Sequence, residues 1–386
     1  MLAMVSDTDL TNSLAQRVRE AAAAGTPLRI RGGGSKDFYG QALSGEVLEM
    51  TPFSGVISYE PSELVVTARA GTPLAELEAL LAAQGQCLPF EPPHFGANAT
   101  VGGMVASGLS GPARASVGTV RDYLLGVKML NGKGESLIFG GQVMKNVAGY
   151  DVSRLMAGAL GTLGVLLEVS LKVLPVAPAE ATLQCRLPQQ AALEILNRWG
   201  GQPLPLNASC WVHDTTASAA PELLFVRLRG AVAAVEAACP RMIADVQAAG
   251  GQAQRMDNAQ AGPDWAACRE QQLPFFVQPP SADACLWRLS VAQTAPVLDL
   301  PYPQFIEWHG ALRWLWAPAS AAAHLRQIAQ QAGGHATLFR RAADGTPGDA
   351  PVFTPLAPVQ RRIQRELKKQ FDPAGVLNPG RMFTGG

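Results

Sequence analysis

A run of three glycines followed by a serine and a lysine, residues 32–36, is the first part of the chain whose residue types suggest chemistry. Successive glycines can adopt positive φ angles and direct consecutive amide N–H groups at one anion, because no Cβ blocks a close approach. Ser35 and Lys36 could add a hydroxyl donor and a positive charge. The run therefore predicts a phosphate cradle, and an ordinary flexible turn is the alternative that these residues alone leave open.

Two further segments are rich in glycine and other small residues. Residues 98–111 read NATVGGMVASGLSG and residues 149–165 read GYDVSRLMAGALGTLGV, so that 15 of the 39 glycines lie between Gly96 and Gly164. Close helix packing would explain one such segment, whereas three in one region indicate a long, phosphate-bearing ligand contacted by main chain. The GxGxxG fingerprint, the GxxxxGK(S/T) phosphate loop and the GxSxG elbow do not occur in the sequence. A nicotinamide enzyme, a nucleotide hydrolase and a serine hydrolase are therefore disfavoured.

Composition excludes several further classes of protein. Lysine plus arginine and aspartate plus glutamate both total 31, so the formal charge is zero and no nucleic-acid partner is expected. The N-terminus carries acids where a signal peptide would be apolar, and no run of about 20 apolar residues occurs, so we expect a cytoplasmic chain without a transmembrane segment. The six cysteines and five histidines lack metal-ligand spacing. We therefore expect reduced, mostly buried thiols and no metal site formed by residues close in sequence.

The hydrophobic pattern predicts the elements that position the glycine segments. We expect a helix over residues 10–24, strands over 28–31, 47–50, 64–70 and 165–173, and a second helix capped by Thr72 that starts at Pro73 and ends before Gly85. All seven tryptophans lie beyond residue 178, and a proline-rich stretch at residues 174–178 precedes the part of the chain that contains them. We therefore predict a first domain of residues 1–177, a second domain of residues 178–345 and a C-terminal segment of residues 346–386.

The hydrophobic pattern of the second domain, residues 178–345, predicts two βαββαβ units and hence an antiparallel sheet. The first unit has strands over residues 182–187, 208–213, 222–229 and 252–256 and helices over 188–199 and 231–249. The second has strands over residues 285–291, 304–309, 312–316 and 335–340 and helices over 295–298 and 319–332.

Some polar residues of the second region are candidates for chemistry. His309 and Arg313 could accept a proton and bind a carboxylate, although a hydrogen-bonded structural histidine is the more ordinary interpretation. Arg340 and Arg341 could also bind a carboxylate. The chain closes with an amphipathic helix over residues 356–371, whose basic face is either solvated or docks a partner.

Four segments resemble the FAD-binding domain of the vanillyl-alcohol oxidase and p-cresol methylhydroxylase (PCMH) family. They are RGGGSK at residues 31–36, PPHFGANATVGGMVASGLSGPAR at 92–114, KNVAGYDVSRLMAGALGTLGV at 145–165 and FDPAGVLNPGRM at 371–382. The order of these segments and their residues are most similar to those of the E subunits of bacterial glycolate oxidases. The resemblance implies an α+β fold, in which a PCMH-type FAD-binding domain of two α/β subdomains precedes a cap domain with an antiparallel sheet of ferredoxin-like βαββαβ units.

The resemblance also implies which residues contact FAD. The first loop would wrap the diphosphate, the second segment would line the diphosphate and the flavin, the third would pass the adenosine half, and the C-terminal turn would return to the flavin ring. The implied residues are Arg31, Gly32, Gly33, Gly34, Ser35, Lys36, Pro93, Thr100, Gly102, Gly103, Ser107, Gly161, Thr162, Gly164, Val165, Asn378, Gly380 and Arg381. Near N1 of reduced flavin, Arg381 could stabilise negative charge, so it joins His309 and Arg313 as a catalytic candidate. Family members that attach FAD covalently commonly carry a histidine in the first loop, where this chain has Ser35 and Lys36, so we predict non-covalent FAD.

The family's activity implies two functions. In the first, the chain works with a larger FAD-containing glycolate oxidase subunit and an iron–sulfur subunit, and either takes a hydride from a small 2-hydroxy acid such as glycolate at flavin N5 or relays electrons. In the second, it is a non-catalytic FAD-binding structural subunit that stabilises the catalytic flavin subunit. The larger subunits use clustered histidines to hold a metal and the substrate, whereas the five histidines here are scattered, which favours the second function. Partner subunits could also hold the chain at the inner face of the membrane.

Overall fold

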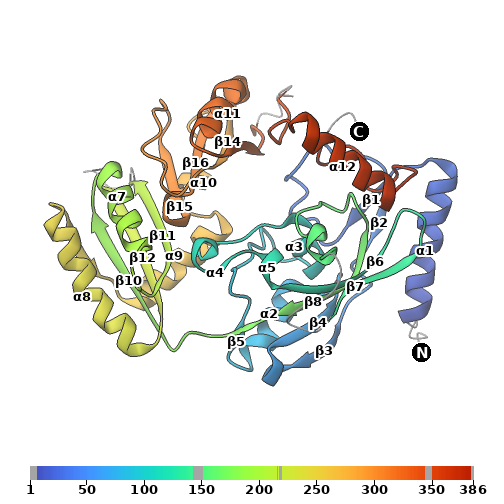
Figure 1. Ribbon diagram of the computed structural model, residues 1–386, viewed down its shortest axis with the longest axis horizontal. Coiled ribbons are helices and arrows are strands. Elements are labelled where there is room, and N and C mark those ends of the chain that lie inside the picture. Colours follow the sequence, from blue (N-terminus) through green and yellow to red (C-terminus); the bar gives the residue numbers. More distant parts are fainter. Residues whose placement is uncertain (1–6, 142–150, 215, 217–219, 344–349, 384–386) are drawn as a thin grey trace. The chain divides into compact units, whose positions relative to one another are not determined.

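The computed structural model describes residues 7–141, 151–214, 216, 220–343 and 350–383. The chain forms two compact units (Figure 1). Unit 1 consists of Met1–Leu109, Thr119–Pro175 and Pro355–Gly386, and unit 2 consists of Ser110–Gly118 and Val176–Thr354. Residues 145–150 of the third predicted cofactor segment and residues 346–349 of the predicted C-terminal segment lie outside the described residues.

Unit 1 contains an antiparallel sheet with the strand order β3-β4-β8-β6-β7. Its strands are β3 (Val56–Glu60), β4 (Val65–Arg69), β6 (Leu124–Leu130), β7 (Ser136–Gly140) and β8 (Val165–Lys172). The predicted strands over residues 64–70 and 165–173 correspond to β4 and β8, which pair with each other inside the sheet and bury most of their side chains. The sequence pattern did not predict β3, β6 or β7.

A second layer of unit 1 surrounds a short parallel strand pair. Strands β1 (Leu28–Arg31) and β2 (Glu46–Glu49) pair in parallel, and Leu28 also bridges to Leu377 near the C-terminus. Helix α1 (Asp7–Ala24) packs Val18 against the cluster that contains Leu28, Leu48 and Leu377. The C-terminal tail is thereby part of the core that holds the start of the first glycine loop.

Short helices and one small strand pair complete unit 1. They are η1 (Pro61–Glu63), α2 (Leu74–Ala82), α3 (Val101–Ser107), α5 (Val120–Tyr123), α6 (Ser153–Met156) and the pair β5 (Gln86–Cys87) with β9 (Leu174–Pro175). The prediction for α2 was one residue early, since Pro73 is its N-cap and Thr72 precedes that cap. The buried Thr72 hydroxyl instead donates to the carbonyl of Gly55 at 3.1 Å.

Helix α12 (Pro358–Phe371) shows the predicted amphipathic pattern, but none of its residues is buried. Val359 and Ile363 on its apolar face are 61% and 54% exposed. On its basic face Lys368 is not simply solvated, because its ammonium donates to the carbonyl oxygens of Thr162 and Leu377, both at 2.7 Å, and pairs with Asp372 at 2.6 Å. Lys368 therefore ties the helix to the C-terminal tail.

Unit 2 is built on an antiparallel sheet with the order β13-β10-β12-β11-β15-β16-β14-β17 (Figure 1). Strands β10 (Ala179–Arg186), β11 (Leu206–His213), β12 (Glu222–Gly230) and β13 (Gln252–Arg255), with helices α7 (Gln189–Gly200) and α8 (Val232–Ala248), form the first βαββαβ unit. Strands β14 (Ala284–Ser290), β15 (Gln304–Glu307), β16 (Leu312–Pro318) and β17 (His335–Arg340), with helix α11 (Ala322–Gln331), form a second unit that has one helix where two were predicted. The two units join through β11 and β15, so the predicted sheet of ferredoxin-like units is confirmed.

The second unit departs from the prediction in two ways. Residues 295–298 form no helix, and Ala295 and Leu298 instead pack as single residues in the core beneath α11. The predicted strand over residues 304–309 ends at Glu307, because a 3-10 turn, η2 (Trp308–Gly310), follows with positive φ at all three residues. A shorter 3-10 turn, η3 (Ala319–Ala321), precedes α11.

Helices α7, α8 and α11 cover one face of this sheet, and a different set of elements contacts the other face. Buried residues of α7 and α8 pack on β10, β11 and β12, and those of α11 pack on β14, β16 and β17. Side chains alternate between faces along a strand. Trp314, next to Leu315 of the α11 core, therefore points the opposite way, where its ring meets Phe276 of α10 (Pro274–Val277) at 5.7 Å. The sequence pattern did not predict α10, α9 (Asn258–Glu270) or α4 (Arg114–Val117).

Candidate functional site

The first glycine loop follows β1 and presents unpaired main-chain donors. The amides of residues 32–35 donate to no acceptor within the described part of the chain. The turn closes after them, where the Asp37 amide donates to the Gly34 carbonyl at 3.1 Å. Consecutive amides without acceptors form a concave donor surface, and such a surface fits an anion.

Close packing requires glycine in this loop. A Cβ on Gly33 would lie 1.4 Å from the backbone oxygen of Asn98, and a Cβ on Gly32 would lie 2.3 Å from Oγ1 of Thr100. Gly34 has a φ of +74°, which side-chain-bearing residues rarely adopt. The first loop therefore rests directly on the second glycine segment.

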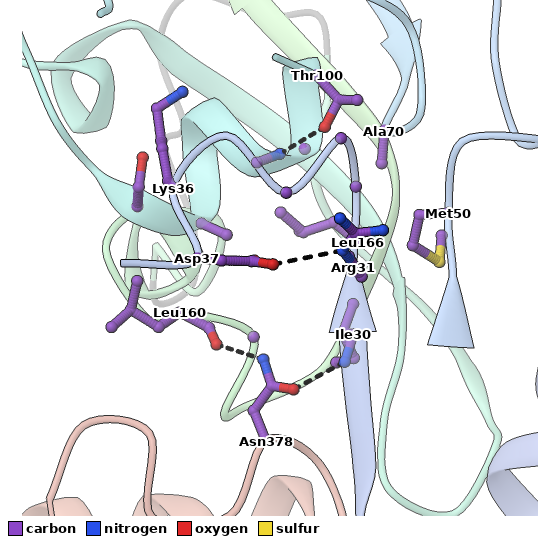
Figure 2. A pocket seen from close by; sticks show the side chains of 18 of the residues that line it. Ile30, Arg31, Lys36, Asp37, Met50, Ala70, Thr100, Leu160, Leu166 and Asn378 are labelled. Atoms are coloured by element: carbon purple, nitrogen blue, oxygen red, sulfur yellow. Dashed lines mark hydrogen bonds and ion pairs between the residues drawn. The ribbon is translucent and has the colours of Figure 1, made fainter. Parts of the chain in front are cut away.

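The second segment, residues 98–111, contains helix α3. Oγ1 of Thr100, the N-cap, accepts a hydrogen bond from the Gly103 amide at 3.2 Å (Figure 2). A Cβ on Gly102 would lie 2.7 Å from Cβ of Ala70, so glycine lets α3 sit against the end of β4. The resulting wall carries little side-chain bulk, which keeps main chain close to the pocket.

Asn378 joins three segments that are far apart in sequence (Figure 2). Its Oδ1 accepts from the Ile30 amide at 2.8 Å and its Nδ2 donates to the Leu160 carbonyl at 2.7 Å. Gly161 has a φ of +71°, and a Cβ there would lie 2.7 Å from Nδ2 of Asn378. This one amide side chain thus holds the C-terminal turn, the third glycine segment and β1 together.

Arg381 lines the pocket from the C-terminal turn, and its guanidinium is fully engaged with main chain. It donates to the carbonyl of Asp37 at 2.8 Å and also to the carbonyls of Tyr39 and Gln41. Burial lowers the pKa of Arg381 to about 10, although the negative charge of Asp37 opposes the shift. Arg381 therefore carries a buried positive charge and clamps the segment after the first loop.

The charged residues at the loop are neutralised within unit 1. Asp37 pairs with Arg29 at 2.5 Å and with Arg31 at 3.3 Å, and Arg31 also lies 3.8 Å from Glu49 (Figure 2). Lys36 donates to the carbonyl of His94 at 3.1 Å. The main-chain amides that the glycine run predicts lie beside Ser35 and Lys36, which both line the pocket.

These segments line one pocket, in which most of the predicted cofactor residues meet. The predicted residues in its lining are Arg31, Gly32, Gly33, Gly34, Ser35, Lys36, Thr100, Gly102, Gly103, Ser107, Gly161, Gly164, Asn378 and Arg381.

Four predicted residues lie outside that lining. Pro93 is buried, and Gly380 is exposed with a φ of +71°. Thr162 turns its hydroxyl to the Ala159 carbonyl at 2.7 Å, and Val165 starts β8 in the core.

The pocket also contains residues that the sequence analysis did not single out. They are Ile30, Asp37, Leu43, Met50, Ala70, Ala106, Leu160 and Leu166. Ala106 and Leu160 lie inside the two glycine-rich segments, so small-residue content could have indicated them. Asp37 and the remaining apolar residues carry no such signal, because single residues of these types are common throughout an ordinary fold.

The remaining catalytic candidates, His309 and Arg313, are buried in unit 2. His309 contacts Ser209 through Nδ1 and Ser116 through Nε2, both at 2.9 Å, and burial lowers its pKa to about 4. Arg313 is fully buried on the α11 side of the sheet and donates to the Ala295 carbonyl at 3.2 Å. Burial lowers the pKa of Arg313 to about 10.

The chemistry of the described residues is that of an anion-binding main-chain surface. Within the described ranges, no group of three or more histidine, cysteine, aspartate or glutamate side chains could hold a metal ion. No described helix is long and apolar enough to cross a membrane. The described cysteines are free thiols, of which Cys87 alone is only partly buried.

The FAD binding domain family model matches residues 8–140. The chain is also 45% identical over 381 residues to glycolate oxidase subunit GlcE of Escherichia coli (strain K12), and the match covers 99% of each chain. Glycolate oxidase subunit GlcD of Bacillus subtilis (strain 168) is 28% identical over 139 residues, which are 36% of this chain and 29% of that protein.

Solved structures show the same fold at low identity. The structure of p-cresol methylhydroxylase with substrate bound aligns with a TM-score of 0.69 at 15% identity, over 96% of this chain and 87% of that chain. The open amides of residues 32–35 and the glycines packed behind them fit the diphosphate of FAD. The match along the full length of both chains shows that the protein is an FAD-dependent flavoprotein and belongs to the GlcE family of glycolate oxidase subunits.

Proposed function

We propose that the chain is the FAD-binding E subunit of a glycolate oxidase complex, and that it takes part in oxidising glycolate, a 2-hydroxy acid, to glyoxylate. The observation that carries the proposal is the 45% identity to GlcE over 99% of both chains, together with a pocket lined by the predicted glycine loops. Bound FAD would supply a hydride acceptor at N5, or would relay electrons to an iron–sulfur subunit.

The residues of unit 1 bind and orient the cofactor in this proposal. The amides of residues 32–35 donate to the diphosphate, because they have no acceptor among the described residues. Asn378 holds β1 and the third glycine segment together, and Arg381 places a buried positive charge in the pocket lining. Among the described residues, none that lines the pocket is a histidine, cysteine or tyrosine, which supports non-covalent binding.

The proposed partners are a larger FAD-containing subunit and an iron–sulfur subunit. The word "subunit" in the names of the relatives from E. coli and B. subtilis supports a complex. We place the complex in the cytoplasm, where its partner subunits could hold it at the inner face of the membrane.

A second function, that of an FAD-binding structural subunit without chemistry of its own, has one observation in its favour. The histidine and arginine proposed from the sequence, His309 and Arg313, are buried among structural partners in unit 2. In this role the chain would keep FAD and stabilise the catalytic flavin subunit.

Anaerobic reduction distinguishes the two functions. The chain is purified alone and together with its copurifying subunits, its flavin spectrum is recorded, and glycolate is added without oxygen. Bleaching of the flavin in the isolated chain supports independent oxidation. Bleaching only in the complex supports a relay or a partner-dependent site, and a bound flavin that never bleaches supports the structural role. A chain that cannot be loaded with FAD would contradict the proposal.

A further inference from the structure

Lys368, near the C-terminal end of α12, closes a small polar junction within unit 1. Its ammonium donates to the carbonyl oxygens of Thr162 and Leu377, both at 2.7 Å, and to the Asp372 carboxylate at 2.6 Å. An ammonium group carries three N–H donors, so these three acceptors use all of them. The Lys368 side chain is therefore fully engaged, although α12 itself buries no residue.

The two carbonyl oxygens that Lys368 contacts lie next to two different parts of the pocket lining. Thr162 directly follows Gly161, and Leu377 directly precedes Asn378. Gly161 and Asn378 line the pocket, whereas Thr162, Leu377 and Lys368 do not. From outside the lining, this one ammonium thus links the third glycine segment to the C-terminal turn.

Asp372 shapes the turn that carries Asn378. Its buried carboxylate accepts hydrogen bonds from the Val376 amide at 3.2 Å and the Leu377 amide at 2.8 Å, in addition to the bond from Lys368. A buried carboxylate that loses its opposite charge is costly, so the Lys368 ammonium also stabilises the turn. Lys368 and Asp372 therefore act as one unit.

The same turn is hydrogen-bonded to β1, directly before the first glycine loop. The Leu28 amide donates to the Val376 carbonyl at 2.7 Å, and the Asn378 amide donates to the Leu28 carbonyl at 2.9 Å. The Asn378 side chain adds its bonds to Ile30 and Leu160 (Figure 2). A displacement of the turn would therefore reach both β1 and the third glycine segment.

We propose that Lys368 and Asp372 are positioning residues for FAD, which act through Asn378 to keep the third glycine segment and the C-terminal turn at the separation that the cofactor needs. Neither Lys368 nor Asp372 lines the pocket, so we expect neither to contact the cofactor. The inference rests on the FAD site and deepens the proposed function, because it makes cofactor retention depend on the docking of α12.

Titration of the full apo chain with FAD, followed by flavin fluorescence, tests the inference. Lys368→Met is expected to raise the dissociation constant of FAD about tenfold, the size expected for loss of a charge-assisted hydrogen bond. Lys368→Arg keeps the charge but should restore little affinity, because a planar guanidinium cannot direct three donors at these acceptors. Lys369→Met removes an exposed lysine that lies 3.8 Å from Glu366, and should bind FAD like wild type.

Loss of FAD must be separated from loss of stability, and Lys128→Met serves as the matched control. Lys128 pairs with Glu168 at 2.8 Å inside the sheet of unit 1, and its side chain is 31% exposed against 25% for Lys368. Urea unfolding of the apo chains gives the stability of each variant. Lys128→Met should keep the wild-type affinity for FAD even where its free energy of unfolding falls.

A double-variant cycle tests whether Lys368 acts through Asn378. Asn378→Gly removes both side-chain bonds and tolerates the φ of +41° at this position. Adding Lys368→Met to it should then cost less than about a further twofold in affinity, because coupled residues are not additive. Lys368→Gln, which keeps an uncharged donor, replaces Lys368→Met in the cycle if that variant does not fold.

Four results would each overturn the inference. They are wild-type FAD affinity in Lys368→Met, full rescue by Lys368→Arg, additive losses in the cycle with Asn378→Gly, and an equal loss of affinity in Lys128→Met. The titrations contain no glycolate, so they are independent of the anaerobic reduction that tests the proposed function.

Discussion

Units 1 and 2 present their hydrogen-bond donors in different ways. Unit 1 offers main-chain amides from residues 32–35, and its nearby charged side chains are paired with one another. Unit 2 offers side chains, with Arg114 and Arg288 held against Trp308. Main-chain donors need glycine packing and tolerate almost no substitution, whereas each guanidinium of unit 2 is carried by a single side chain packed on an indole.

Two arginines illustrate the contrast. Arg381 of unit 1 donates to three main-chain carbonyls and is buried, so its first role is to hold the segment after the glycine loop. Arg288 of unit 2 has no acceptor among the described residues. Arg381 is therefore held by main-chain hydrogen bonds, whereas Arg288 is held against two indole rings.

Gly33→Val should have the largest effect. The new Cβ would lie 1.4 Å from the Asn98 carbonyl oxygen, so the two glycine segments cannot keep their contact. Relieving the clash should lower the affinity for FAD more than tenfold, so we expect the FAD content to fall to less than roughly a tenth of wild type. The measurement is the ratio of flavin to protein absorbance after reconstitution. Gly262→Ala, where nothing lies within 4 Å of the added Cβ, is the control and should keep its FAD.

Arg381→Met should destabilise unit 1. It leaves the carbonyls of Asp37, Tyr39 and Gln41 without their donor, which costs about 3 kcal/mol or more of unfolding free energy. Urea denaturation followed by circular dichroism measures the loss. An unfolding free energy equal to that of wild type would show that Arg381 is not a clamp, and would weaken the contrast with Arg288.

The stability of unit 2 should fall as the pH drops from 6.5 to 4. Burial lowers the pKa of His309 to about 4, so in this window the unfolded chain binds a proton that the fold excludes. Proton linkage therefore lowers the free energy of unfolding by about 3 kcal/mol between pH 6.5 and pH 4, and the lowered pKa of His335 acts in the same direction. His309→Asn tolerates the positive φ and removes the titrating group, so it should flatten most of this dependence in urea titrations. A wild-type profile as flat as that of the variant would contradict the prediction.

Arg288→Gln should have the smallest effect on stability. It removes cation–π contacts with Trp308 and Trp314 but no hydrogen bond to a described residue, so the free energy of unfolding should change by no more than about 1 kcal/mol. The same urea experiment as for Arg381→Met tests this directly. A loss as large as that of Arg381→Met would show that Arg288 is structural and would remove the distinction between the two units.

Local patterns predicted much of the fold. Alternating and helical periodicity gave the strands and helices of the two βαββαβ units within a few residues, because each element buries one face of its own. The pattern failed at residues 295–298, where Ala295 and Leu298 enter the core without helical structure. It also failed at α9 and α10, whose apolar residues do not follow helical spacing closely.

The pocket of unit 1 was predictable to the extent that glycine marks it. Gly32, Gly33 and Gly161 stand out in the sequence, and the structure brings all three to the pocket. The cluster of unit 2 was not predictable in this way. Arg114 is 174 residues before Arg288 in the sequence, and only the tertiary bonds around Trp308 bring them to one ring.

The most direct test of the account is the flavin content of the purified chain before and after acid precipitation. The main-chain site of unit 1 predicts about one FAD per chain, released into the supernatant when trichloroacetic acid unfolds the protein, because no covalent bond holds it. A yellow pellet would contradict non-covalent binding. A chain that stays colourless after reconstitution with FAD would contradict the assignment of the glycine loops to the cofactor.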